Sequence, residues 1–465
     1  MYRLRTALRL PPCLAAVAVC VACLGRPSEG EGEGDVGVYD FPSRFDDELS
    51  SVAYPGQSAR HLLIAELKQF IGSIEDTDYL GKSANDVVAD LAFFYDFKNA
   101  GGSPEEPVTI KVNNTEMLQR TFGEVGVASL DEKMPDKDIA STEPVVGFGD
   151  STLLASEVAL AMFGNLGALV ADRGNGTVPA DPAGADIPSP WVDANGVDWQ
   201  QLIQKYLDGA VVFSQGCDDY LSDTVDGKGL LSDNTVPAIS GDERQPYTAL
   251  EHAWDEAFGY FGAGRRFGAQ SIEDNAGGFV DTNEDGRADW TTEVNRALSK
   301  NAASRDQGAV VPTSFSTHAF AAFFAGRRLI TQADGALNDA QLAELRGHRD
   351  DVIAAWEGAL AASAVHYINA LLQDMAGPQE EYDFLAHAKH WSELKGFLLA
   401  LNFHAGSPAR PYLEEIHGLV RAAPELDRAR FGAYGADLLR VRDRLQEIYA
   451  FADDNVGDEH GLFGW

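Results

Sequence analysis

Apolar residues recur with a helical period along most of the chain. In HLLIAELKQFIGSI (61–74) they stand three and four positions apart, which places them on one face of an α-helix. The same period predicts helices in ten later segments: 84–97, 151–170, 199–221, 247–263, 290–302, 315–330, 338–375, 381–403, 409–421 and 429–452.

Long stretches without this period separate the predicted helices. Residues 98–150 contain one short apolar run, PVTIKV (107–112), that fits a strand, and residues 171–196 form a loop rich in Gly and Pro. Loops of this length in a folded domain are usually functional or inserted. The sequence therefore predicts an all-α fold of helical bundles with long irregular loops.

The beginning of the chain has the features of an export signal. Three arginines precede an apolar run, Leu14–Ala22, that is too short to span a bilayer. A small residue then precedes Cys23, as at the end of a lipoprotein signal. We expect a signal peptide at 1–22, lipid on Cys23 and a flexible tether at 23–40, with ordinary secretion as the alternative. The chain would then lie in the cell envelope, in the periplasm or at the outer membrane, attached to the membrane only by its lipid.

The folded part is expected to begin near residue 41 and to continue to residue 465. A boundary between two bundle halves is expected near residue 305. Beyond Cys23, Cys217 is the one remaining cysteine, so no intramolecular disulfide is predicted and Cys217 is expected to be a small buried side chain.

The net charge narrows the class of partner. The formal charge is −36, and it becomes −39 when residues 1–22, with three arginines and no acidic residue, are removed. Such a surface repels nucleic acid and attracts cations, so a nucleic-acid partner is excluded. Two causes of the acidity stay open: the handling of cations and adaptation to a saline environment.

The segment DTNEDGRADW (281–290) has the ligand order of a calcium loop, with a glycine at the sixth position. A standard EF-hand has Glu at position twelve, whereas here Thr292 stands there and Glu293 follows, so a shorter Asp-rich loop is the better match. The alternative is an acidic turn that caps a helix beginning at 290. The five predicted calcium ligands are Asp281, Asn283, Asp285, the carbonyl group of Arg287, and Asp289.

The segment EHAWDEAFGYFG (251–262) places four ligand-type side chains on neighbouring faces of a predicted helix. Side chains four positions apart share a face, and an imidazole with carboxylates suits iron, zinc, copper or manganese. The alternative is an amphipathic helix with acidic residues in its first turns and an ordinary boundary histidine. The predicted transition-metal ligands are Glu251, His252, Asp255 and Glu256.

A second stretch, HAKHWSELKGFLLALNFH (387–404), offers His390, Glu393 and Lys395 as partners on a facing helix. A buried Lys395 would need an acid such as Glu251 or Glu256, because an unpaired interior charge is costly. The alternative is a packing helix anchored by its tryptophan. Phosphate loops, dinucleotide fingerprints, nucleophile elbows, paired CxxC motifs and His-Glu-x-x-His are all absent from the sequence.

Five segments occur in a characteristic order: YPGQSARHLLIAELK, DWQQLIQKYLDGAVVFSQ, EHAWDEAFGYFG, DTNEDGRADW and KHWSELKGFLLALNF. Together they resemble a family of bacterial lipoproteins described as domain of unknown function 4856, related to the imelysin superfamily. The resemblance runs from about residue 40 to the C-terminus. It implies an imelysin-like fold of two four-helix bundles and an association with iron regulation and uptake, and some members are classed as peptidases.

The imelysin signature Gly-x-His-x-x-Glu falls on residues 250–255 of this chain. Leu250 stands in place of the glycine and Asp255 in place of the glutamate, unless Glu256 takes that role one position later. These departures weaken the transfer of metal binding, and they weaken the transfer of peptidase activity more.

The leading functional expectation is a non-enzymatic, lipid-anchored protein that binds a metal ion or metal complex and supports uptake of iron or another transition metal, together with outer-membrane uptake components. A structural calcium ion would order the 281–290 loop. One alternative is a metal-dependent hydrolase or peptidase in which His252 holds the metal and Glu256 is the general base. Another is a calcium-ordered surface protein that recognises a partner through the 171–196 loop.

Overall fold

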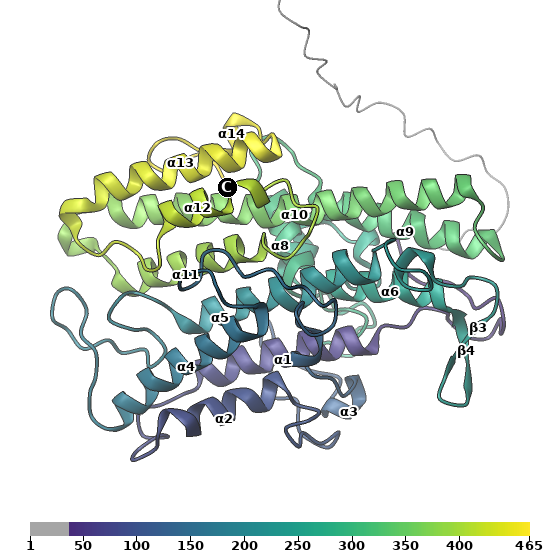
Figure 1. Ribbon diagram of the computed structural model, residues 1–465, viewed down its shortest axis with the longest axis horizontal. Coiled ribbons are helices and arrows are strands. Elements are labelled where there is room, and N and C mark those ends of the chain that lie inside the picture. Colours follow the sequence, from purple (N-terminus) through teal and green to yellow (C-terminus); the bar gives the residue numbers. More distant parts are fainter. Residues whose placement is uncertain (1–36) are drawn as a thin grey trace, which may run out of the picture. The chain divides into compact units, whose positions relative to one another are not determined.

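The computed structural model describes residues 37–465 (Figure 1). The predicted signal peptide, Cys23 and most of the predicted tether lie outside the described residues. The described part is mostly helical, which confirms the all-α prediction. Its α-helices are α1 (Pro55–Gly72), α2 (Ala84–Tyr95), α3 (Phe122–Val125), α4 (Ala155–Gly174), α5 (Trp199–Leu207), α6 (Ala249–Phe261), α7 (Ile272–Gly277), α8 (Ala297–Gln307), α9 (Phe315–Ala333), α10 (Asp339–Ala376), α11 (Phe384–Ala400), α12 (Leu413–Val420), α13 (Phe431–Tyr449) and α14 (Asp453–Val456).

The longest helix, α10, organises the packing. It contacts α8, α9, α11 and α13, while α1 contacts α2, α5 and α6 (Figure 1). Most of its residues from Ala355 onward are buried, including Trp356, Leu360 and Ile368. This helix therefore has partners on several sides, which explains why apolar residues there do not follow a single stripe.

The predicted helix 199–221 changes its winding halfway. It is α-helical in α5 and then π-helical in two turns, η2 (Asp208–Phe213) and η3 (Gln215–Tyr220). Cys217 lies in the second π-helical turn and is buried, as predicted. π-Helical turns are rare, and the first of these two, η2, packs against α11.

Two small sheets interrupt the helices. Strand β1 (Lys111–Val112) pairs with β2 (Thr115–Glu116), and β3 (Pro237–Ser240) pairs with β4 (Glu243–Thr248), both antiparallel. The predicted strand at 107–112 is thus present only in its last two residues. The β3–β4 hairpin was not predicted, because Pro, Gly and charged residues interrupt its alternation of apolar and polar positions.

The start of the folded part packs against α6. Tyr39 is fully buried, and its ring stacks on Phe258 of α6 at a centroid distance of 3.7 Å. The boundary predicted near residue 305 falls inside α8, and the described residues, 37–465, belong to one compact unit. Within residues 37–465, no helix combines the length and the apolarity needed to cross a bilayer.

Candidate functional site

Helix α6 is bounded by hydrogen bonds that its sequence encodes. The Thr248 hydroxyl accepts the N–H of Glu251 (3.1 Å), and the Glu251 carboxylate accepts the N–H of Thr248 in return (2.9 Å). The helix ends at Gly262, whose φ of +85° lies in the left-handed region. His61 of α1 donates from Nε2 to carbonyl groups of the last turn. Helix α6 therefore begins and ends within the predicted range 247–263.

The apolar stripe of α6 faces the core. Trp254, Phe258 and Phe261 are all fully buried. The indole N–H of Trp254 donates to the carbonyl oxygen of Phe323 (2.9 Å), and the Phe261 ring lies edge-on to Trp356. These contacts fix the rotation of the helix and so decide where its polar residues point.

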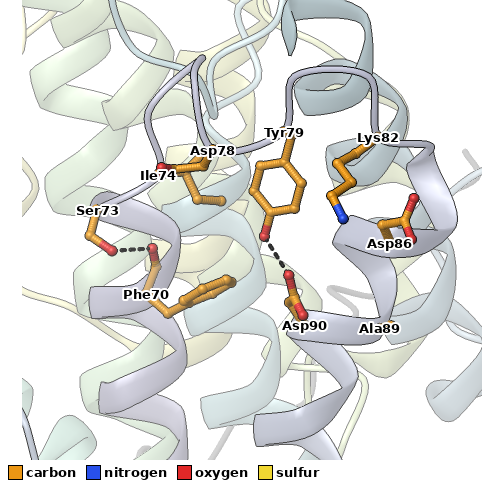
Figure 2. A pocket seen from close by; sticks show the side chains of 9 residues that line it. All are labelled: Phe70, Ser73, Ile74, Asp78, Tyr79, Lys82, Asp86, Ala89 and Asp90. Carbon is orange, nitrogen blue, oxygen red and sulfur yellow. Dashed lines mark hydrogen bonds between the residues drawn. The ribbon is translucent and has the colours of Figure 1, made fainter.

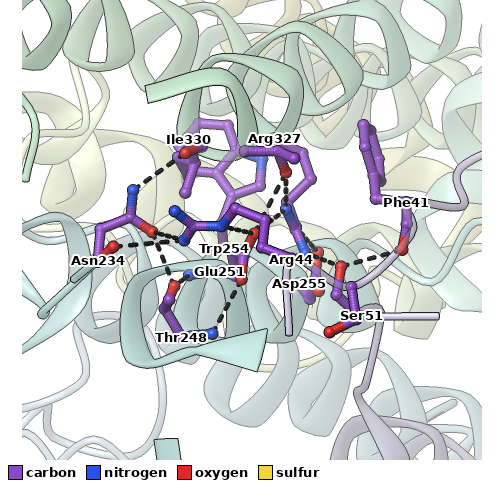
Figure 3. A network of polar contacts seen from close by, with 12 residues as sticks. Phe41, Arg44, Ser51, Asn234, Thr248, Glu251, Trp254, Asp255, Arg327 and Ile330 are labelled. Atoms are coloured by element: carbon purple, nitrogen blue, oxygen red, sulfur yellow. Dashed lines mark hydrogen bonds and ion pairs between the residues drawn. The ribbon is translucent and has the colours of Figure 1, made fainter. Parts of the chain in front are cut away.

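Glu251 and Asp255 point into the protein, and Arg327 of α9 lies between them (Figure 3). Its Nε donates to Asp255 (2.9 Å) and its Nη1 to Glu251 (3.1 Å), and all three side chains are fully buried. Its Nη2 donates to the hydroxyl group of Ser51 (2.6 Å). One planar guanidinium thus bridges two carboxylates, which suits its fixed fork of donors.

A second guanidinium completes this charge network. Nε of Arg44 lies 3.4 Å from Oε1 of Glu251, and the hydroxyl of Tyr39 donates to Asp255 (2.9 Å). Burial raises the pKa of Asp255. Burial acts in the same direction on Glu251, but the Arg327 charge, the hydrogen bond from the Thr248 N–H and the Arg44 charge together outweigh it, so the pKa of Glu251 is lowered. Two positive and two negative groups together leave no net charge in the interior.

The outer face of α6 carries His252 and Glu256, one turn apart. His252 donates from Nδ1 to the carbonyl oxygen of Ala53 (3.0 Å), and Gln57 donates from Nε2 to Oε1 of Glu256 (2.9 Å). The other two atoms of the pair, Nε2 of His252 and Oε2 of Glu256, lie 3.6 Å apart. The side chains are 29 % and 19 % exposed. Both therefore face the surface with one polar atom anchored and one directed at the other residue.

The anchors decide the chemistry of this pair. Because a carbonyl oxygen can only accept a hydrogen bond, Nδ1 of His252 carries a proton and Nε2 is the atom that faces Glu256. Histidines that bind metals are commonly oriented in this way through their other nitrogen. The two anchors, Ala53 and Gln57, come from the short stretch that opens α1, so one element fixes both side chains.

A tyrosine covers the His252 imidazole. The ring of Tyr247, at the end of β4, stacks on the His252 imidazole with centroids 4.5 Å apart and planes 17° apart. Burial, with a contribution from the charge of Glu256, raises the pKa of Tyr247. The Tyr247 ring thus covers one face of the imidazole.

The predicted set of four metal ligands is divided by the structure. Glu251 and Asp255 are bound to Arg327 in the interior, and a guanidinium in that position leaves no room for a cation. His252 and Glu256 alone remain at the surface. Within residues 37–465, no three His, Cys, Asp or Glu side chains are grouped so as to hold a metal ion.

Lys395 does not pair with an acid of α6. Its ammonium group contacts Nδ1 of His417 (3.2 Å) and donates to the carbonyl oxygen of Arg421 (2.9 Å), at the end of α12. The predicted pairing with Glu251 or Glu256 is wrong, because partners on α9 and α1 hold those carboxylates. Carbonyl groups at a helix end favour a nearby cation, whereas burial lowers the pKa of Lys395 to about 7.

The other two predicted partners also lie on α11, which packs against α5 and α10. Nδ1 of His390 lies 2.7 Å from Oδ2 of Asp374 on α10, and Glu393 is buried at 5 % exposure. Trp391 donates from its indole to the carbonyl oxygen of Val420 (3.2 Å). Trp391 and Lys395, one turn apart on α11, therefore both donate to carbonyl groups at the end of α12. This is the arrangement expected of a packing helix that is anchored by its tryptophan.

The 281–290 loop adopts turns that place oxygen atoms inside it. The carboxylate of Asp281 accepts the N–H groups of Asp285 (3.2 Å) and Gly286 (2.8 Å). Asn283 accepts the N–H of Asp285 (2.9 Å), and Asp285 accepts the N–H of Arg287 (2.8 Å). Gly286 has a φ of +78°, the left-handed corner that this motif requires.

Asp289, the fifth predicted ligand, is engaged elsewhere. Its carboxylate accepts hydrogen bonds from Gln119 (2.7 Å) and from the hydroxyl groups of Thr291 and Thr292 (both 2.7 Å). Glu293 closes the loop by accepting the N–H group of Asp289 (3.2 Å). The helix predicted from residue 290 begins only at Ala297, so Asp289 stabilises a turn and not a helix.

A surface hollow of about 350 Å³ lies between the end of α1 and the start of α2 (Figure 2). Three carboxylates line it, and all three already accept hydrogen bonds: Asp78 from the N–H of Glu75, Asp86 from the hydroxyl of Ser83 and Asp90 from the hydroxyl of Tyr79 (each 2.8 Å). None of the residues predicted from the sequence as a ligand lines this hollow. It therefore adds nothing to the site on α6.

Several residues of the site were not predicted. Ala53 and Gln57 anchor the pair, Tyr247 stacks on the imidazole, and Arg327 neutralises the buried acids. No spacing rule links these positions to His252, because they lie on other elements. The one signal of these partners in the sequence was the number of acidic residues on α6. If such residues are buried, they need a positively charged side chain from another element.

Comparison with known proteins places the chain in a family without a described function. No curated protein and no solved structure matches it. A family model described as Domain of unknown function (DUF4856) matches residues 164–421, more than half of the 465 residues. The matched range includes α6, the 281–290 loop and α11. The chain therefore belongs to the DUF4856 family.

Proposed function

We propose that this chain is an exported, lipid-anchored protein of the cell envelope that binds a transition-metal complex and supports metal uptake, with iron as the leading candidate. The observation that carries the proposal is the pair formed by Nε2 of His252 and Oε2 of Glu256, 3.6 Å apart. Both side chains are anchored through their other polar atom and accessible from solvent. An anchored imidazole and carboxylate that face each other can bind one metal together.

A metal complex fits this pair better than a bare ion. Transition metals usually take four or more ligands, and His252 and Glu256 supply two. The remaining positions would be filled by groups that the metal brings with it. A carrier that completes the coordination of an already chelated metal can also release it readily, which suits an uptake role.

Copper(II) iminodiacetate tests the pair directly, because the chelate leaves coordination positions open and the electron paramagnetic resonance spectrum resolves a bound imidazole nitrogen. We expect one equivalent to bind to the purified protein through a nitrogen that disappears in His252→Gln. Gln57→Ala, which frees the Glu256 carboxylate, should weaken binding by about 10–100-fold, as loss of an outer-shell partner usually does.

The matched control is His318→Gln. Nε2 of His318 also lies 3.6 Å from a carboxylate, that of Asp351, but both side chains are more than half exposed. We expect this variant to bind the copper chelate as the unaltered protein does. Unchanged binding in His252→Gln would contradict the proposal.

We also propose that calcium binds the 281–290 loop and orders it. The side-chain oxygens of Asp281, Asn283 and Asp285, held by turns within the loop, support this second cation. At about 100 times its dissociation constant, a calcium ion that binds only the folded state adds about 2.7 kcal/mol to the free energy of unfolding.

Thermal unfolding with and without calcium measures this effect. We expect Asp281→Asn to lose the stabilisation, and Asp242→Asn, in the exposed turn between β3 and β4, to keep it. The proposal fails if calcium stabilises the Asp281→Asn variant as much as the unaltered protein.

A further inference from the structure

We infer that a second hollow, beside residues 135–146, binds a zwitterionic α-amino acid with an apolar side chain through the ion pair of Arg410 and Glu143. The hollow has a volume of about 240 Å³. None of the residues that line it belongs to α6 or to the 281–290 loop. The inference therefore goes beyond the proposed function and does not rest on it.

The wall of this hollow is mostly apolar. Three of its lining side chains, Val145, Phe403 and Leu413, are buried members of the core. Val145 comes from the irregular stretch before α4, Phe403 follows the end of α11, and Leu413 opens α12. The volume is smaller than the roughly 300–1,000 Å³ of pockets that hold drug-sized ligands, so it suits a molecule of the size of one amino acid.

Hydrogen bonds fix the polar part of the hollow. Asn402 holds Val146 through both atoms of its side-chain amide: Oδ1 accepts the N–H of Val146 (2.9 Å), and Nδ2 donates to its carbonyl oxygen (3.2 Å). The backbone carbonyl oxygen of Asn402 accepts a hydrogen bond from Nη1 of Arg410 (2.9 Å). One residue just after α11 therefore positions both the 135–146 segment and the guanidinium. A site that is ordered in advance loses little entropy when a ligand binds.

The other edge of the guanidinium forms an ion pair. Nη2 of Arg410, in the 3₁₀ turn η7 (Arg410–Tyr412), contacts the carboxylate of Glu143, and the two side chains are 30 % and 67 % exposed. Ion pairs with this exposure are weak, because water screens both charges. A ligand that offers a carboxylate to Arg410 and an ammonium group to Glu143 can therefore separate the two side chains and still satisfy both.

The charges around the hollow select a zwitterion. Asp136 also lines it, where it accepts the N–H (2.9 Å) and the hydroxyl (2.5 Å) of Ser156 at the start of α4. The lining residues thus carry one positive and two negative charges. A plain carboxylate would compete with Glu143 for Arg410 and would add a third negative charge, whereas an amino acid adds no net charge.

Three related compounds separate these contributions: L-leucine, 4-methylpentanoate, which lacks its amino group, and 3-methylbutylamine, which lacks its carboxylate. We would titrate each into the purified protein at neutral pH and measure binding by isothermal titration calorimetry. We expect L-leucine to bind about 10–100-fold more tightly than either analogue, because each analogue loses a hydrogen bond to a charged group. L-Methionine and L-phenylalanine extend the series to other apolar side chains.

Glu143→Gln should change the affinities for two of these compounds in opposite directions. Removal of this carboxylate takes away the partner of the ammonium group and frees Arg410, so L-leucine should bind more weakly and 4-methylpentanoate more tightly. Arg410→Met should abolish the binding of both. Arg440→Met is the matched control, because Arg440 also forms an exposed ion pair, with Asp437 of α13, and does not line the hollow. This variant should bind L-leucine as the unaltered protein does.

The outcomes are distinct. Opposite changes of the two affinities in Glu143→Gln support the inference. Equal affinities for L-leucine and 4-methylpentanoate, binding of L-leucine that survives Arg410→Met, or a lack of binding by all three amino acids overturns it. Binding of copper iminodiacetate through His252 does not depend on these results, so each of these failures leaves the proposed function standing.

Discussion

Neighbouring residues on α6 have opposite chemical roles. Glu251 is fully buried against Arg327, whereas His252, the next residue, is 29 % exposed at the surface. Each step along an α-helix turns the side chain by about 100°, so adjacent positions face different environments. The spacing of four that joins Glu251 to Asp255 and His252 to Glu256 therefore defines two faces and not one ligand set.

Arg327 should be among the most important residues for stability. Replacement by Met leaves two buried carboxylates without their shared cation, and breaking such a buried ion pair destabilises a protein by about 3–5 kcal/mol. Urea unfolding followed by circular dichroism measures this loss. We expect part of it to be recovered when Glu251→Gln and Asp255→Asn are added, because those changes remove the unpaired charges.

Arg328→Met supplies the control for that series. Arg328 is the next residue of α9 and is exposed. A surface substitution of this kind usually changes the free energy of unfolding by less than about 0.5 kcal/mol. Equal losses in Arg327→Met and Arg328→Met would show that the buried network contributes no special stability.

Among the elements, the change from α5 to the π-helical turns shows where packing overrides sequence period. A Cβ atom added at Gly209 would lie 2.6 Å from the Cβ atom of Ala400 on α11, so the two elements approach closely at that point. The apolar spacing at 199–221 predicted a helix, which is present. The spacing carried no sign of the wider π-helical turn, because that turn depends on the fit against α11.

Gly209→Ala should therefore destabilise the protein. The added methyl group meets backbone and side-chain atoms of Ala400 that cannot move freely, and overpacking of this kind costs about 1–3 kcal/mol. Differential scanning calorimetry would detect it as a lower unfolding temperature.

Gly164→Ala on α4 is the matched substitution. Its added Cβ atom would meet no other atom within 4 Å. An alanine at an unstrained helical glycine stabilises by about 0.4–1 kcal/mol. A stabilising effect at both glycines would contradict the close packing described for α11.

On the scale of the whole molecule, the dominant property is negative charge. The formal charge of −36 belongs to a chain whose interior already pairs Glu251 and Asp255 with Arg327 and Arg44. The excess acids therefore lie mainly at the surface, where they repel one another. This repulsion is long-ranged at low salt and is screened within about 3 Å at 1 M salt.

Salt should therefore stabilise the protein. Raising sodium chloride from about 0.1 M to about 1 M shortens the screening length from about 10 Å to about 3 Å, and the unfolding temperature should rise as repulsion weakens. Differential scanning fluorimetry at neutral pH measures this shift. Near the sequence isoelectric point, about pH 4.5, the same salt increase should have little effect. An equal rise at both pH values would contradict charge repulsion as its cause.

The sequence by itself determined most of the helices and the class of fold. Apolar side chains at a helical period must be buried along one face, and this local requirement located helices such as α9 and α13 within a few residues. The capping residues Thr248 and Gly262 likewise set the limits of α6 through bonds to their own neighbours. Asp281, Asn283 and Asp285 shape their loop in the same local way.

Only the tertiary structure decided what the polar residues of those helices contact. Arg327 comes to Glu251 from 76 positions away, and Ala53 to His252 from 199 positions away, so no local period could reveal either contact. The same holds for Lys395, whose partners lie at the end of α12 and not on α6. The spacing of apolar residues indicates which face of a helix is buried. The partner of a charged side chain, however, depends on how separate helices pack against one another.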